Sequence, residues 1–263
     1  MSHQNIPTIH LLCMESKFLD AFNEVLPAHW PEYHNTSTTS NDADLPIKIH
    51  THSSSLAAFP RTTKFDLIVS PANSYGRLDG AFDDAISRAF CLPHHDYDTL
   101  TRAAQKVLYE KYRGFAPPGT CELIPFPAEL IRGTNTTGEG ADEGWGCKWV
   151  GLCPTMRTPD NVRWDREVVY ECVWSLLCAV EGWNRGLEEG KGGEYRERGR
   201  IESLLITPMA TGCGAVSPKK WAAQFVLAMR YFVDALERPE RWSALGWREI
   251  YEDTNDVEQT WKM

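Results

Sequence analysis

The sequence lacks several features that mark common classes of protein. Its eight cysteines include no C-x-x-C pair, so a zinc site is poorly supported and we predict neither metal nor cofactor. No uninterrupted apolar run approaches the roughly 20 residues that a membrane-spanning helix needs. Residues 1–5 are polar and show no secretory signal. We therefore expect an intracellular protein, cytoplasmic or nuclear, with reduced and mostly buried thiols.

Positive charge is also scarce. Lys and Arg number 27 against 36 Asp and Glu, which gives a formal net charge of −9. Surfaces that bind nucleic acid or anionic membranes are usually basic, so we expect neither as a partner. A phosphate ligand is still compatible with this charge, because backbone amides can hold phosphate without basic side chains.

Complete catalytic signatures are missing as well. The chain has no G-x-S-x-G and no Walker A loop. Gly212 and Gly214 begin a dinucleotide fingerprint, but Ser217 stands where its third glycine belongs. The sequence thus excludes the common signatures of serine hydrolases, P-loop NTPases and Rossmann dehydrogenases.

What the sequence does contain is an alternation of strand-like and helix-like segments. Apolar or alternating runs predict strands, and apolar residues at a spacing of three and four predict helices. This alternation predicts an α/β fold with a mostly parallel sheet and helices on both of its faces. The predicted strands are 8–13, 47–51, 64–69, 120–127, 147–153 and 201–206, and the predicted helices are 15–26, 79–90, 99–112, 165–180 and 218–236.

We expect a single domain over residues 1–263, with a core of about 8–236 and three insertions. Residues 31–46 are rich in Ser, Thr, Asn and Asp and predict a loop. Residues 133–146 predict a surface hairpin, or less favourably a mobile lid. Residues 181–200 predict an exposed, charged linker. In the C-terminal extension, 237–263, only a short helix or strand around 242–251 is indicated.

Two glycine-containing loops carry most of the functional information. The first runs from Ser70 to Asp83 and the second from Thr207 to Pro218, and each follows a predicted strand and precedes a predicted helix. Such a loop presents free backbone N–H groups at the positive end of a helix, which suits phosphate. In the second loop we expect the N–H groups of residues 212–216 to point into one concavity. Taken alone, this loop is equally consistent with a plain strand-to-helix turn.

The start of the last long helix is well marked, because Ser217 is a favoured N-cap and Pro218 a favoured first residue. Both glycine loops follow the carboxyl ends of strands, which is where ligands bind in open α/β sheets. We therefore expect the two loops to meet at one crevice.

The first loop adds polar side chains. Asn73 can donate and accept hydrogen bonds, which suits a sugar hydroxyl. Asp79 and Asp83 are four residues apart and would lie on one face at a helix start. Spacing alone favours a helix-capping role for both, while a carboxylate near an anomeric carbon could position a water molecule.

These motifs, in this order, resemble a macrodomain, the ADP-ribose-binding α/β module. The usual Val-Asn-Ala-Ala-Asn reads here Val69-Ser70-Pro71-Ala72-Asn73. The Gly-rich stretch and the Val-Asp-x-Ala-Ile that follow it read Leu78-Asp79-Gly80-Ala81 and Phe82-Asp83-Asp84-Ala85-Ile86. The second family loop, Gly-Thr-Gly-x-Gly-Gly, reads Ala210-Thr211-Gly212-Cys213-Gly214-Ala215, and 149–156 is similar to the central strand and its exit.

The resemblance implies a three-layer α/β/α fold with a mixed, mostly parallel sheet, and ADP-ribose or an ADP-ribosylated protein as partner. Asn73 would contact the distal ribose, and the second loop would hold the diphosphate. In the hydrolytic branch of the family, Asn73 and Asp83 would be catalytic and would position a water for attack at the ribose C1″ carbon, so mono-ADP-ribosyl hydrolase activity is expected. The implied ligand-binding residues are Ala72, Asn73, Leu78, Asp79, Gly80, Ala81, Phe82, Thr211, Gly212, Cys213, Gly214, Ala215 and Val216.

Departures from the family pattern keep other functions open. Ser70-Pro71 replaces Asn-Ala, and the family's Gly-Asp-Ile segment, whose Asp reads the adenine amino group, is replaced by Thr51 to Ser55. The alternatives are a non-catalytic reader of ADP-ribose, a binder of another nucleotide or phosphorylated metabolite, and an interaction scaffold without a ligand.

Overall fold

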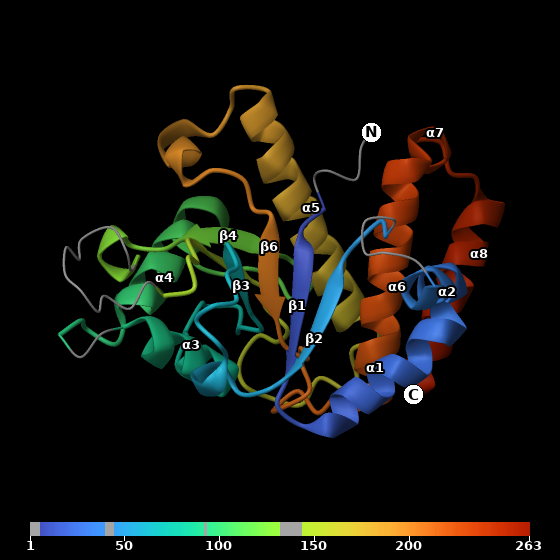
Figure 1. Ribbon diagram of the computed structural model, residues 1–263, viewed down its shortest axis with the longest axis horizontal. Helices are drawn as coiled ribbons and strands as arrows, with labels where there is room; N and C mark the ends of the chain where they lie inside the picture. Colours follow the sequence, from blue (N-terminus) through green and yellow to red (C-terminus); the bar gives the residue numbers. More distant parts are fainter. Residues whose placement is uncertain (1–5, 40–44, 92–93, 132–143) are drawn as a thin grey trace.

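A computed structural model describes residues 6–39, 45–91, 94–131 and 144–263 (Figure 1). Six strands form one sheet in the order β2-β1-β6-β3-β5-β4. Every neighbouring pair is parallel except β4 and β5, which are antiparallel. The strands are β1 Thr8–Cys13, β2 Ile49–Ser53, β3 Leu67–Ser70, β4 Glu122–Pro125, β5 Trp149–Leu152 and β6 Ser203–Ile206.

Helices cover both faces of this sheet (Figure 1). One face packs against α1 (Ser16–His29), α5 (Val168–Glu188) and α6 (Pro218–Glu237). The other packs against α3 (Phe82–Phe90) and α4 (Thr99–Tyr112). The predicted α/β/α fold with a mixed, mostly parallel sheet is therefore confirmed.

Side chains of one strand divide between the two helical layers. In β1, Leu11 is buried against the α1, α5 and α6 layer, whereas Leu12 is buried against the α3 and α4 layer. Successive residues of a strand point to opposite faces, so an apolar run such as Leu11-Leu12 is the signature of a strand covered on both sides.

The predicted start of α6 is also confirmed. The Ser217 hydroxyl accepts a hydrogen bond from the Lys220 N–H at 3.1 Å, and Pro218 is the first helical residue. Thirteen residues of α6 are buried, among them Trp221 and Phe225, so this helix lies in the middle of its layer.

Two predicted insertions turn out to contain helix. The loop predicted over 31–46 is wrong at its start, since residues Pro31–Thr39 form α2, and residues 40–44 lie outside the described residues. The linker predicted over 181–200 is wrong as well: α5 continues to Glu188, and Gly193–Arg198 form the 3-10 helix η5. A contact of Asn184 accounts for the continuation of α5 beyond residue 180. The side-chain amide of Asn184 exchanges two hydrogen bonds with the Ile201 backbone, at 2.8 and 2.9 Å, which ties the end of α5 to the approach to β6.

The hairpin predicted over 133–146 falls mostly outside the described residues. Within its described end, Trp145 is buried and stacks on Phe65 with ring centroids 5.7 Å apart, whereas Gly146 is exposed. Shorter 3-10 segments, η3 Leu56–Ala58 and η4 Ala128–Leu130, occupy other connections.

The C-terminal extension is more ordered than its pattern indicates. It forms α7 (Pro239–Trp242), α8 (Trp247–Glu258) and η6 (Gln259–Lys262). Tyr231 of α6 donates a hydrogen bond to Asp256 at 2.7 Å, and Gln224 of α6 donates one to the buried Thr260 at 2.9 Å. These buried polar contacts attach the extension to the outer side of α6.

Candidate functional site

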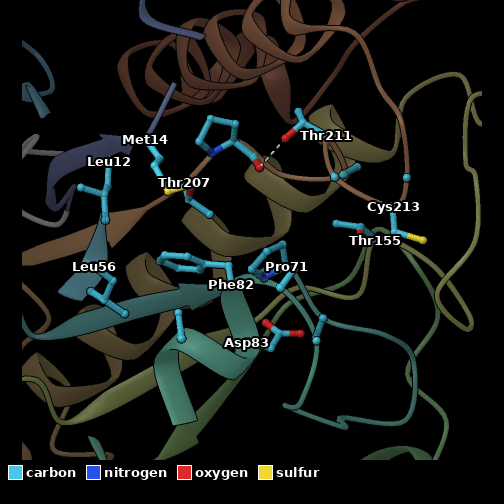
Figure 2. Close-up of a pocket in the computed structure, with 18 of the residues that line it drawn as sticks. Leu12, Met14, Leu56, Pro71, Phe82, Asp83, Thr155, Thr207, Thr211 and Cys213 are labelled. Carbon is cyan, nitrogen blue, oxygen red and sulfur yellow. Dashed lines mark hydrogen bonds between the residues drawn. The ribbon is translucent and has the colours of Figure 1, made fainter. Parts of the chain in front are cut away.

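Both glycine loops line one cavity of about 580 Å³. Its walls come from the segments that follow β1, β2, β3, β5 and β6, so the cavity (Figure 2) lies at the carboxyl ends of the parallel strands. That is the expected place for a ligand in an open α/β sheet, and the volume is within the range of small-molecule sites. The predicted meeting of the two loops at one crevice is confirmed.

Backbone groups shape the second loop. The Ala215 N–H donates to the Gly212 carbonyl and the Val216 N–H donates to the Ala210 carbonyl, both at 3.0 Å. These two N–H groups are used inside the loop, so the prediction that all of residues 212–216 direct their N–H groups into the concavity is wrong. Ala210 and Ala215 both have positive φ, 59° and 57°, and this left-handed backbone lets the chain fold back on itself.

The tip of the same loop has free donors. Within the described chain, no group accepts a hydrogen bond from the N–H of Thr211, Gly212, Cys213 or Gly214, and all four residues line the cavity. Unpaired backbone donors at a concave surface are a favourable environment for an anion.

Gly214 is required by close packing rather than by φ. A Cβ atom there would lie 2.5 Å from the Ala210 carbonyl oxygen and 2.9 Å from a methyl carbon of Val162. The Val162 N–H in turn donates to the Gly214 carbonyl at 3.0 Å. At Gly212 a Cβ would meet nothing within 4 Å, so the two glycines of the motif have different roles.

Side chains, in contrast, hold the first loop. The Asn73 amide donates to the Arg77 carbonyl at 2.8 Å and its oxygen accepts from the Tyr75 N–H at 3.0 Å. Arg77 pairs with Asp79, with the guanidinium Nε 2.9 Å from the carboxylate. Much of the polar capacity of Asn73 is therefore used to close the loop over residues 73–77.

The helix after the first loop begins later than predicted, at Phe82. Its N-cap is Ala81, with φ 49° and ψ −118° and no side-chain cap. The capping role predicted for Asp79 is therefore wrong, because Asp79 lies outside the helix and pairs with Arg77. Asp83 lies in the first turn of α3 as predicted, but its side chain does not cap the helix and instead accepts a hydrogen bond from Ser70. The N–H groups of Gly80, Ala81 and Phe82 have no acceptor within the described chain, and these residues line the same cavity.

Asp83 is a buried carboxyl on the cavity wall. Its side chain is one of those labelled in Figure 2, and the residue is only 6% exposed. Burial raises the pKa of Asp83 to about 7, the Ser70 hydroxyl, 2.7 Å away, opposes the rise, and the nearby charge of Asp79 adds to it. A carboxyl with a pKa near neutrality can exchange a proton with water at physiological pH.

Most of the predicted site residues lie around the cavity, and three do not. Leu78 is fully buried: its N–H donates to the Thr101 hydroxyl and its carbonyl accepts from Ser87, at 3.1 and 2.6 Å. Ala215 and Val216 lie behind the loop tip. Those that line the cavity are Ala72, Asn73, Asp79, Gly80, Ala81, Phe82, Asp83, Thr211, Gly212, Cys213 and Gly214.

At one end of the cavity, only the segment Thr51 to Ser55 was indicated by the sequence, and the apolar residues there were not. This end is mainly apolar, with polar groups from Glu15, Ser54 and Ser55, and Figure 2 shows Leu12, Met14 and Leu56 gathered there with Phe82. The available signal was positional: these residues end or follow the strands predicted over 8–13 and 47–51. Phe18, at the start of α1, also lines the cavity.

Residues after β5 form another unpredicted wall, which includes Thr155 and Met156. An isolated parallel bridge joins Asn73 to Met156, and the Thr155 N–H donates to the Ala72 carbonyl at 2.9 Å. This pairing extends the β3–β5 ladder beyond the strands and sets the position of the first loop.

The described residues contain neither a cluster of metal-ligating side chains nor a membrane-spanning helix. No three His, Cys, Asp or Glu side chains in these ranges are arranged to hold a metal ion. Among the helices of the same residues, none has the length and apolar character needed to cross a membrane.

Among known proteins, similarity is found to solved structures. No family model matches the chain, and no curated protein matches it. The chain is similar to the solved structure of the Oceanobacillus iheyensis macrodomain with MES bound, at 15% sequence identity and a TM-score of 0.42, over 76% of this chain and 86% of that one.

Proposed function

We propose that this protein binds ADP-ribose and hydrolyses the bond that links a single ADP-ribosyl group to a modified side chain. The observation that carries the proposal is the meeting of two sets of unpaired backbone N–H groups, at 80–82 and 211–214, around one cavity with a buried carboxyl on its wall. The order of the two motifs, which resembles that of macrodomains, supports the same ligand.

The diphosphate is assigned to the second loop. Its tip offers four N–H groups without basic side chains, and a negatively charged protein can bind phosphate in this way. The start of α3 offers further N–H groups and the positive end of a helix dipole. Together these donors supply the polar contacts that two phosphate groups need in a mainly apolar cavity.

The terminal ribose is assigned to the side of the cavity with Asn73 and Asp83. In the proposed reaction the ionised Asp83 carboxylate takes a proton from a water molecule as the water oxygen forms a bond to C1″. The bond from C1″ to the modified side chain breaks, and that side chain leaves with the electron pair of the bond. A pKa near 7 makes the ionised form available at neutral pH while leaving it basic enough to accept the proton.

The adenine is assigned to the apolar end formed by Leu12, Met14, Leu56 and Phe82. Apolar side chains can contact the faces of a planar base, and removal of this surface from water is favourable. Glu15 supplies a carboxylate at this end, where the family's usual Asp is missing.

Calorimetric titration with ADP-ribose and ADP tests the binding part. We expect saturable binding of ADP-ribose that is clearly tighter than that of ADP, because ADP lacks the terminal ribose. Preference for ADP, or the same affinity for both, would refute the assignment of the cavity to ADP-ribose.

Release of ADP-ribose from a mono-ADP-ribosylated protein tests the catalytic part. We expect turnover by the wild type and its loss in Asp83→Asn, with ADP-ribose binding retained. Asp84→Asn is the matched control, because Asp84 is the next residue of α3 but pairs with Arg88 at 2.8 Å. Tight binding by a wild type that releases no ADP-ribose would identify a reader.

A second candidate function is a non-catalytic binder of ADP-ribose or of another nucleotide. It is favoured by Asn73, whose amide is committed to the 73–77 loop, and by the serines that replace the base-reading Asp. This candidate predicts binding without turnover. A reader of ADP-ribose would prefer ADP-ribose to ADP, whereas a binder of another nucleotide would show a preference that does not depend on the terminal ribose.

A further inference from the structure

Thr155 combines a buried hydroxyl that lacks a partner with a position on the cavity wall. Four buried side-chain polar atoms in the described residues have no hydrogen-bond partner. Three belong to Asp98, Trp149 and Trp221, none of which lines the cavity, and the fourth is Thr155 Oγ1. Buried polar groups are almost always paired, so one on a cavity wall without a partner among the described protein atoms is a candidate contact for a ligand.

The local structure holds this hydroxyl in place. Thr155 is 1% exposed, and its N–H donates to the Ala72 carbonyl at 2.9 Å, so the backbone is anchored to the residue next to Asn73. A turn about the Cα–Cβ bond is enough to exchange the methyl and hydroxyl positions without moving that backbone. Figure 2 shows Thr155 at the same end of the cavity as Cys213, opposite the apolar end with Leu12 and Leu56.

Thr211, a cavity threonine of the second loop, has a hydroxyl that is satisfied within the protein. The Thr211 hydroxyl donates to the Pro208 carbonyl at 3.1 Å (Figure 2). The two residues therefore differ in the group that is available to a ligand. In Thr211 it is the backbone N–H, and in Thr155 it is the side-chain hydroxyl.

We propose that the Thr155 hydroxyl contacts the terminal sugar of the ligand and gives the site part of its preference for that sugar over a free diphosphate. The inference rests on the proposed function. The reason for choosing the sugar is the bridge between Asn73 and Met156. Met156 follows Thr155 directly, so Thr155 lies next to the loop that would hold the ribose. A sugar hydroxyl both donates and accepts, which matches the capacity of a threonine hydroxyl.

The proposal predicts opposite effects of Thr155→Val on stability and on binding. Valine has the shape of threonine without the unpaired polar atom, so the melting temperature of the unliganded protein should rise by about 2–4 °C. The dissociation constant for ADP-ribose should rise about three- to tenfold, as expected for one lost hydrogen bond, while that for ADP should stay within twofold. Thr155→Ser keeps the hydroxyl and should keep the wild-type affinity for both ligands.

Thr260→Val is the matched control. Thr260 is also fully buried, but its hydroxyl accepts from Gln224 at 2.9 Å and donates to the Val257 carbonyl at 2.7 Å, far from the cavity residues in sequence and outside its lining. Its replacement should lower the melting temperature and leave both dissociation constants unchanged.

The outcomes separate this inference from the proposed function. If the wild type binds ADP-ribose no better than ADP, the proposed function fails. If the wild type prefers ADP-ribose and Thr155→Val weakens both ligands by the same factor, Thr155 does not read the sugar and the inference alone is overturned. The inference is also overturned if Thr155→Val binds ADP-ribose as tightly as the wild type does, or if Thr155→Val is less stable than the wild type without ligand.

Discussion

The two loops that meet at the cavity are built in different ways. The first, 73–82, is held by side chains: the Asn73 amide and the Arg77–Asp79 ion pair. The second, 207–216, is held by backbone hydrogen bonds and by the absence of a side chain at Gly214. The two walls of the cavity should therefore respond differently. The wall formed by the first loop depends on side chains and so on pH and substitution, whereas the wall formed by the second loop depends on the path of the main chain.

The largest predicted effect concerns Asp83, which belongs to the first wall. We predict that its titration makes the free energy of unfolding depend on pH near neutrality. The folded protein raises the pKa of Asp83 from its usual value of 3.8 to about 7, so the folded state binds the proton more tightly than the unfolded chain. The proton on Asp83 therefore stabilises the folded state by on the order of 4 kcal/mol. This stabilisation is fully present below about pH 4 and is lost as the pH rises through 7. Asp83→Asn should abolish this loss, so the free energy of unfolding of the variant should exceed that of the wild type increasingly from pH 4 to 8.

Urea unfolding at several pH values measures this difference, with Asp84→Asn as the control. The pKa of Asp84 is lowered, in the direction opposite to that of Asp83, because hydrogen bonds from Arg88 and Tyr97 outweigh the effect of burial. Parallel stability profiles for the wild type and Asp83→Asn would contradict the argument. If Asp83 is also the base, turnover by the wild type should rise with pH through about 7, because only the ionised form accepts the proton.

The wall formed by the second loop should instead be disrupted by one added methyl group, in the variant Gly214→Ala. In Gly214→Ala the new Cβ would lie 2.5 Å from the Ala210 carbonyl oxygen, so the loop must open or the backbone must shift. We expect a loss of about 2–3 kcal/mol in the free energy of unfolding, with little dependence on pH. ADP-ribose binding should be lost with it, because the free N–H groups depend on this path of the chain.

Gly212→Ala provides the comparison within the same loop. Nothing lies within 4 Å of a Cβ at this position, so the free energy of unfolding should change by less than about 0.5 kcal/mol. Equal destabilisation by the two substitutions would show that general glycine flexibility, rather than the contact at Gly214, holds the loop.

The sequence was most informative where local physical rules act. The strand at 8–13, the cap at Ser217 and the convergence of both loops follow from apolar patterning, N-cap preference and parallel topology, and each agrees with the structure. The sequence was least informative where tertiary contacts override composition. The polar segment 31–39 forms a helix, and α5 continues to Glu188, where the Asn184 contact with Ile201 is invisible to any local pattern.

The same limit explains the errors within the site. Spacing placed Asp79 and Asp83 at a helix start, but the choice of partners depends on Arg77 and Ser70, which only the folded chain brings into reach. Ala215 and Val216 belong to a glycine motif by position, yet their N–H groups turn inward because Ala210 has left-handed φ. A motif therefore predicts which loop binds and leaves open which of its atoms face the ligand.

A third prediction concerns the side-chain network of the first loop. Asn73→Ala removes one donated and two accepted hydrogen bonds that close the loop over 73–77, and should lower the free energy of unfolding by about 1–2 kcal/mol. Affinity for ADP-ribose should fall more than affinity for ADP. Asn161→Ala removes a similar loop contact, with the Arg163 N–H at 2.8 Å and outside the cavity, and should affect neither affinity.

The smallest predicted effect tests whether strain is stored in the first wall. Ala81 holds φ 49° and ψ −118°, a conformation that glycine adopts readily and that costs other residues about 1–3 kcal/mol. Ala81→Gly should relieve this cost, offset by about 0.4–1 kcal/mol of added freedom in the unfolded chain, so the free energy of unfolding should rise by about 1 kcal/mol. Ala103→Gly, inside α4, should lower it by about 0.5–1 kcal/mol. A fall in both variants would mean that Ala81 is unstrained, and the difference between the two walls would then rest on side-chain hydrogen bonds alone.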